Sequence, residues 1–112
     1  MEHPNPADAF HIDLLGPDAD GRLVVRISGD VDRHAGSRLR DGLWEAIAQR
    51  PTQVVVDAMN VVFLGSAAVS TLIRAAERAR LDGVGFRIER ASPIVHRVLA
   101  IVDIGLDGSP QT

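Results

Sequence analysis

The sequence feature that most constrains the fold is an almost entirely apolar and β-branched run, Thr52 to Val56. A strand that meets water on one side usually alternates apolar and polar residues. A run that is apolar at nearly every position instead indicates a strand covered on both faces. We therefore expect these residues to form a central strand, with the remaining elements packed around it.

The segment before this strand predicts a hairpin and a helix. Phe10–Leu15 alternates apolar and polar residues, and Arg22–Gly29 is rich in β-formers, with a glycine- and proline-bearing turn between them. Two such runs joined by a short turn predict an antiparallel hairpin. Apolar residues at helical spacing follow, and Arg50-Pro51 ends that helix because proline disfavours helical geometry in the residue before it.

The segment after the central run alternates helix and strand. Ser66 to about Leu81 has helical periodicity, and Gly83 is placed to close that helix. A short alternating strand follows from Gly85 to Glu89, and Ser92-Pro93 has the form of a helix start, with the serine as N-cap. The order is β-β-α-β-α-β-α, which predicts a single α/β domain with a mixed sheet of about four strands and three helices.

Length and composition limit the classes of function. The 112 residues fit one domain, which we place at residues 10–106, with a leader at 1–9 and a short tail at 107–112. The net charge of −3 and the dispersed arginines do not predict nucleic-acid binding. No apolar run is long enough for a membrane span, and nothing resembles a secretory signal. The chain has no cysteine, and we expect a cytoplasmic protein.

The residues do not form a recognisable catalytic or cofactor site. The four histidines lack the spacing of metal ligands, and no glycine-rich phosphate loop is present. Gly65-Ser66-Ala67-Ala68 lacks the G-x-S-x-G pattern of a hydrolase nucleophile. We therefore predict no metal, no cofactor and no enzymatic activity.

Three aspartates are candidates for a binding site. Asp30 and Asp32 could act as paired carboxylates, but we favour Asp32 as the cap of the first helix and Asp30 as a solvated strand end. Asp57 follows the central apolar run, so we expect it to end that strand. There it would either belong to a ligand site, as is common at this edge of a parallel sheet, or turn the loop.

Ser66 has two compatible interpretations. As an N-cap, its hydroxyl would accept a backbone N–H and stabilise the helix by about 1 kcal/mol. As a phosphorylation site, it would carry a dianion at the positive end of the helix. Gly65, Ala67 and Ala68 make the surface around it small and uncharged, which suits a docking face.

Several segments, in order, resemble the STAS domain of the bacterial anti-sigma factor antagonists. Ile27-Ser28-Gly29-Asp30-Val31-Asp32 resembles the family's L-x-G-E-L-D segment, and Val61-x-Phe63-Leu64-Gly65-Ser66-Ala67-Ala68-Val69 its V-x-F-x-D-S-[ST]-G-L signature. The segments Val54–Asp57, Gly83–Ile88, Ser92–Leu99 and Gly105-Leu106 are similar to further family segments. The resemblance covers about residues 22–106.

The resemblance implies a regulatory binding protein. Such a domain binds an anti-sigma factor, which is a serine kinase of the GHKL type, and thereby releases a sigma factor. The kinase phosphorylates the signature serine, here Ser66, and a PP2C-type phosphatase reverses the modification. The partner-binding candidates are Asp30, Asp32, Asp57, Gly65, Ser66, Ala67 and Ala68.

The signature differs from the family pattern around its serine. Gly65 stands in place of the family's aspartate, Ala67 in place of a hydroxyl residue, and Ala68 in place of a glycine. Three hypotheses therefore stay open: a phosphorylation switch at Ser66, a constitutive binding or scaffold module, and a small-ligand or nucleotide sensor using Asp57 and the helix start. The chain stops soon after Gly105-Leu106, so the last strand and helix common in the family would be short or absent. Part of the sheet or of the third helix would then be exposed, and a homodimer could cover it.

Overall fold

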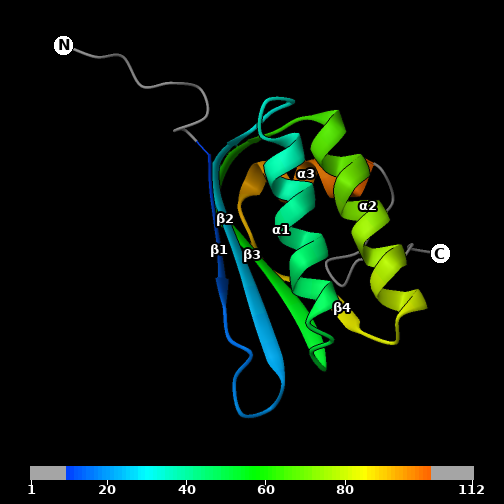
Figure 1. Ribbon diagram of the computed structural model, residues 1–112. Coiled ribbons are helices and arrows are strands. Elements are labelled where there is room, and N and C mark those ends of the chain that lie inside the picture. Colours follow the sequence, from blue (N-terminus) through cyan, green and yellow to red (C-terminus); the bar gives the residue numbers. More distant parts are fainter. Residues whose placement is uncertain (1–9, 102–112) are drawn as a thin grey trace.

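The computed structural model describes residues 10–101, and it has the expected order of elements (Figure 1). The predicted leader, tail and domain end at residue 106 lie outside the described residues. The strands and helices are β1 (Phe10–Leu15), β2 (Arg22–Val31), α1 (Gly36–Ala48), β3 (Gln53–Leu64), α2 (Ser66–Leu81), β4 (Gly85–Ala91) and α3 (Pro93–Ile101).

The four strands form one mixed sheet in the order β1-β2-β3-β4. β1 and β2 form the predicted antiparallel hairpin, whereas β2, β3 and β4 are mutually parallel. The carboxylate of Asp18 closes the hairpin turn by accepting the amides of Asp20 (2.9 Å) and Arg22 (3.0 Å). These hydrogen bonds lower the pKa of Asp18, because they favour its charged form.

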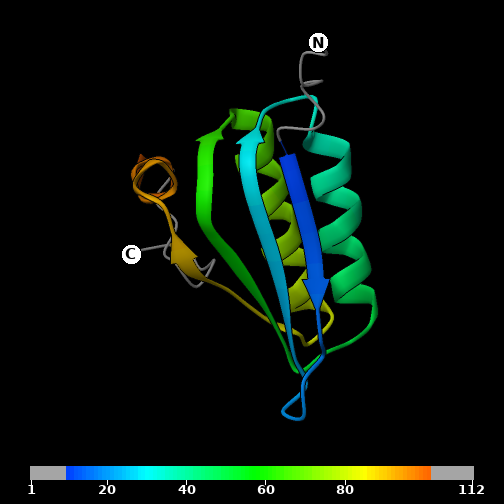
Figure 2. The same cartoon turned by 90° about the vertical axis from the view of Figure 1, so that its left-hand side faces the viewer.

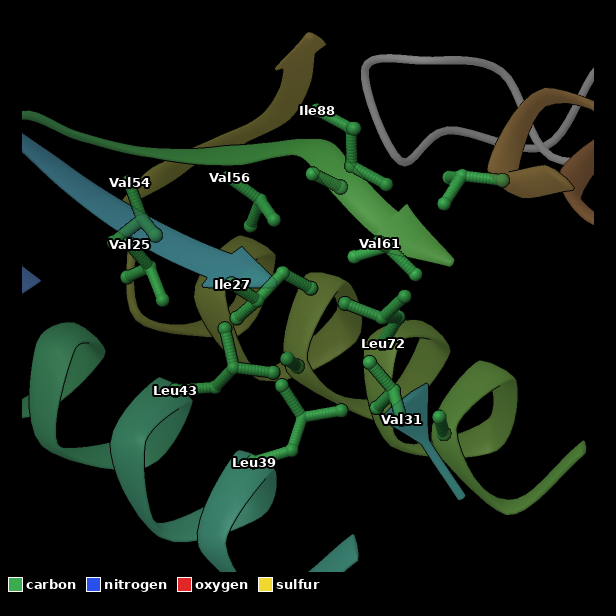
Figure 3. Close-up of a cluster of buried hydrophobic side chains, with 14 of the residues drawn as sticks. Val25, Ile27, Val31, Leu39, Leu43, Val54, Val56, Val61, Leu72 and Ile88 are labelled. Carbon is green, nitrogen blue, oxygen red and sulfur yellow. The ribbon is translucent and has the colours of Figure 1, made fainter. Parts of the chain in front are cut away.

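The helices lie on one side of the sheet, and the core fills the space between them (Figures 1 and 2). Val54 and Val56 of β3 point toward the helices and belong to the same buried cluster as Leu39 and Leu43 of α1 (Figure 3). Val55 points to the opposite face, yet only 1% of it is exposed. The expectation that the central strand is covered on both faces is therefore confirmed for Val54–Val56, whereas Thr52 is exposed and precedes the strand.

Charged side chains, rather than helices, cover the second face at Val55. Arg22 of β2 and Glu89 of β4 form an ion pair (2.5 Å) that spans β3, the strand between them. Arg87, which is in register with Val55, pairs with the same glutamate. The aliphatic parts of such long side chains exclude water while their charged ends stay hydrated.

β3 is longer than predicted, and this corrects the expectation that Asp57 ends it. The strand continues to Leu64, with register shifts against β2 between Asp57 and Asn60 and between Val61 and Phe63. Such bulges turn successive side chains to the same face. Ala58, Val61 and Leu64 are buried as a result, while the residues between them are exposed.

Ser92 ties the start of α3 to this extended part of β3. Its hydroxyl donates to the carbonyl of Val61 (2.6 Å), and its amide donates to the carbonyl of Ala58 (3.1 Å). The serine precedes α3 as predicted, but its hydroxyl forms a hydrogen bond with β3 rather than with the helix amides. α3 is thereby held against the end of the core, where Val95 and Leu99 are buried.

We predict that Ser92→Ala lowers the free energy of unfolding by about 1–2 kcal/mol, because a buried carbonyl loses its donor. Ser70→Ala, at an exposed position of α2, is the matched control and should change stability by less than about 0.5 kcal/mol. Urea unfolding followed by circular dichroism measures both. Equal effects of the two substitutions would show that the Ser92 hydroxyl does not stabilise the fold.

Two loops meet at the opposite end of the sheet. Gly83 has a positive φ of 73° and closes α2, with the amide of Val84 donating to the carbonyl of Ala79 (2.8 Å), as expected. Arg50 closes α1 with a positive φ of 53°, and its guanidinium donates to the carbonyl of Asp82 (3.4 Å). A residue with a side chain is strained at this φ, whereas glycine is not.

We therefore predict that Arg50→Gly raises the free energy of unfolding by roughly 0.5–1 kcal/mol through relief of this strain. Gln49→Gly is the control, because Gln49 has an ordinary φ of −72°. It should instead destabilise by up to about 1 kcal/mol. Thermal and urea unfolding compare the two variants, and a loss of stability in both would contradict the prediction.

Candidate functional site

The candidate site lies where the parallel strands β2 and β3 end side by side. Val31 pairs with Leu64, and the amide of Gly65 donates to the carbonyl of Val31 (2.9 Å), one residue beyond the ladder. The turn after β2 and the start of α2 are therefore adjacent. This edge of an open α/β sheet is where such folds place ligands and partners.

Ser66 is the first residue of α2, and the structure corrects its interpretation as the N-cap. Gly65 holds the N-cap position with an extended backbone (φ −79°, ψ 167°), and no side chain caps the helix. The Ser66 hydroxyl makes no hydrogen bond to any residue within 10–101, and its side chain is exposed. It is therefore free to react.

The start of α2 is positively polarised. The first three amides of a helix lack intrahelical partners, and the first turn of α2 contains no acidic residue. The helix dipole adds a partial positive charge at this end. A phosphate on Ser66 would therefore meet unpaired amide donors rather than a competing carboxylate.

The surface around Ser66 is small and apolar. Ala67 is exposed, whereas Ala68 is fully buried and offers no side-chain surface to a partner. Val62 and Phe63 are 68% and 49% exposed, and an added Cβ on Gly65 would lie 3.4 Å from the Phe63 ring. The surface formed by Val62, Phe63, Gly65, Ser66 and Ala67 is called the docking surface below.

Two aspartates at the end of β2 flank the docking surface. Asp30 pairs with Phe63 across the ladder and is half-buried. Asp32 caps the turn before α1: its carboxylate accepts the amides of His34 (2.9 Å) and Ala35 (3.2 Å). The helix itself has Ala35 as N-cap without a side-chain bond, so Asp32 acts one turn earlier than predicted.

Asp57 is not part of this site. It lies in the middle of β3, where Arg26 and Arg90 approach its carboxylate at 3.5 and 4.0 Å. The rise of a strand puts it roughly 20 Å from Leu64 at the strand end. The ligand site that sequence reasoning built from Asp57 and the helix start is therefore not assembled.

No group of three metal-ligating side chains gathers anywhere in residues 10–101. Over the same residues, no helix is both long and apolar enough to cross a membrane.

Sequence reasoning missed the exposed residues of β3. Val62 and Phe63 both face outward because of the bulge, which simple strand alternation does not predict. The only sequence signal is the spacing of three between Ala58, Val61 and Leu64, which fits neither a regular strand nor a helix.

Gly65 can accept the aspartate that the family signature carries there. Its φ is ordinary, and an added Cβ would make only normal contacts. We predict that Gly65→Asp raises the free energy of unfolding by about 0.5–1 kcal/mol, through capping and the helix dipole. Gly83→Asp, at a positive φ of 73°, should lower it by about 1 kcal/mol. Urea unfolding tests the pair, and destabilisation by Gly65→Asp would refute the capping geometry.

Sequence comparisons relate the chain to STAS-domain proteins. The family model described as "Mlab, STAS domain" matches residues 17–108. A STAS-domain containing protein of Pseudomonas aeruginosa is 34% identical over 86 residues, which are 76% of this chain and 84% of that protein. The anti-sigma-F factor antagonist RsfB of Mycobacterium tuberculosis is 29% identical over 90 residues, which are 80% of this chain and 71% of RsfB.

Solved structures have the same fold. An anti-sigma factor antagonist from Mycobacterium paratuberculosis matches with a TM-score of 0.70 and 27% identity, over 82% of this chain and 78% of that one. The anti-sigma factor antagonist SpoIIAA in its unphosphorylated form matches with a TM-score of 0.68 and 21% identity, over 84% and 80% of the two chains.

Proposed function

Because the chain belongs to the STAS-domain family, we propose that it is an anti-sigma factor antagonist, which binds an anti-sigma factor and so releases a sigma factor. The observation that carries this proposal is the exposed, unbonded Ser66 hydroxyl at the first position of α2, inside the docking surface. Relatives named as anti-sigma factor antagonists support the role.

The docking surface suits a protein partner. Exposed Val62 and Phe63 supply apolar area, and contiguous apolar surface of this kind marks interaction sites. Gly65 and Ala67 let the partner approach the backbone closely. Asp30 and Asp32 form a charged rim that would orient a partner with basic residues. Asp57, in contrast, is too distant to share the same contact.

Phosphorylation of Ser66 would act as the switch in this proposal. The partner, a GHKL-type kinase, would transfer the γ-phosphoryl group of ATP to the Ser66 oxygen, releasing ADP and the hydroxyl proton. The resulting dianion would be stabilised by the amides at the start of α2. It would also place charge and bulk against an apolar interface, so the complex would dissociate. A PP2C-type phosphatase would restore the hydroxyl, and this chain would be a substrate without catalysing a step.

Ser66→Asp tests whether charge at this position governs binding. We predict that it weakens binding to the cognate anti-sigma factor by about 2 kcal/mol, or roughly thirty-fold, because a carboxylate would be buried without a partner. Gln49→Glu adds the same charge at the far end of α1 and should leave affinity within about twofold. Calorimetry measures both, with circular dichroism as the check of folding.

Phosphate mapping separates the switch from the constitutive alternative. Incubation with the cognate kinase and ATP should modify Ser66, detected by mass spectrometry, and Ser66→Ala should remove the signal. The specific observation that favours constitutive binding is the replacement of the family's aspartate, hydroxyl residue and glycine by Gly65, Ala67 and Ala68. Tight binding without modification, unaffected by Ser66→Asp, would establish that alternative.

A further inference from the structure

The sheet face opposite the helices carries a regular pattern of charge. Within residues 10–101 no helix covers it, and Figure 2 views it with α1 and α2 behind the strands. We call it the open face and define it by two rows of side chains that the strand registers align. The first row is Asp13, Arg26, Asp57 and Arg90, and the second row is Leu15, Val24, Val55 and Arg87.

The first row alternates in sign from one edge of the sheet to the other. Asp57 pairs with Arg26 at 3.5 Å and with Arg90 at 4.0 Å. Asp13 makes no ion pair with the described residues and is exposed at the β1 edge, while Arg90 is exposed at the β4 edge. The row therefore begins with an unpaired acid and ends with a weakly paired base.

We propose that the open face is the interface of a homodimer whose two-fold axis runs parallel to the strands, between β2 and β3. This rotation lays β1 over β4 of the partner subunit and β2 over its β3, and it keeps each row opposite the same row. Asp13 then meets Arg90 of the partner subunit, and Arg26 meets Asp57 of the partner subunit. The two-fold rotation reverses the order of the row. Because the row has four members of alternating sign, every acid then lies opposite a base of the partner subunit.

The second row fits the same arrangement. Val24 is half-buried near the axis, whereas Val55 lies beneath the Arg22–Glu89 ion pair, so Val24 would pack against the aliphatic stems of that ion pair on the partner subunit. At the ends, the aliphatic stem of Arg87 would cover Leu15, which is 42% exposed in the single chain. An apolar partner would instead bury these charges without counter-charges, at high cost.

The size of the face predicts a weak dimer. Four strands are about 19 Å wide and six residues of strand about 20 Å long, so the face lies at the low end of specific interfaces. The docking surface remains uncovered at the strand ends. Because the axis is parallel to the strands, both copies of Ser66 would lie at the same end of the dimer. The inference does not depend on the proposed function.

Charge reversal at the two edges tests the arrangement. Asp13→Arg and Arg90→Asp each place like charges opposite one another in their own homodimers, so each variant should sediment as a monomer at concentrations where the unmodified full chain dimerises. Mixed in equal amounts, the two variants regain both opposite-charge pairs and should dimerise again. Within one sheet these two residues are about 14 Å apart, so only pairing between chains explains such rescue. Sedimentation velocity over a concentration series measures all of these states.

Several results would overturn the proposal. They are a monomeric unmodified chain up to millimolar concentration, a dimer unchanged by Asp13→Arg, or mixed variants that stay monomeric. Glu45→Arg, on the exposed surface of α1, is the matched control and should leave dimerisation unchanged. Thermal unfolding verifies that each variant is folded. If Arg90→Asp does not fold, Arg90→Gln replaces it, and mixing with Asp13→Arg should then restore part of the dimer signal.

Discussion

Strand β3 is the element on which the rest of the structure depends. Its first half pairs with β2 and β4 and places Val54 and Val56 in the core, so the sheet cannot form without it. Its second half does not pair with β4, and β2 and Ser92 hold it in place instead. The strand then passes directly into Gly65 and Ser66, so the same element that organises the core also sets the position of the candidate phosphorylation site.

The bulges in β3 connect folding to recognition. A regular strand would direct only one of Val62 and Phe63 outward, and the docking surface would be smaller. The irregular register exposes both while Val61 and Leu64 remain buried, so apolar area is gained without opening the core. Phe63 then lies close to Gly65, which precedes the exposed Ser66.

Apolar side chains on the two faces of the sheet are shielded from water in different ways. On one face, helices bury aliphatic side chains, which is the common arrangement for parallel strands. On the other, ion pairs such as Arg22–Glu89 cover Val55 while staying hydrated themselves. Surface ion pairs contribute little stability alone. Their more specific effect is to give the open face a charge order that only a matching surface can satisfy, and a second copy of this chain is such a surface.

The sequence by itself determined the order of elements, the hairpin, the closure of α2 by Gly83 and the placement of Ser66 at a helix start, because these follow from local periodicity and backbone preferences. It did not determine that β3 runs past Asp57 to Leu64, since strand length there depends on pairing with β2. Tertiary structure also decided that Gly65 rather than Ser66 is the N-cap, and that Asp57 lies far from the site. These outcomes depend on register and on contacts between distant segments, which local pattern does not encode.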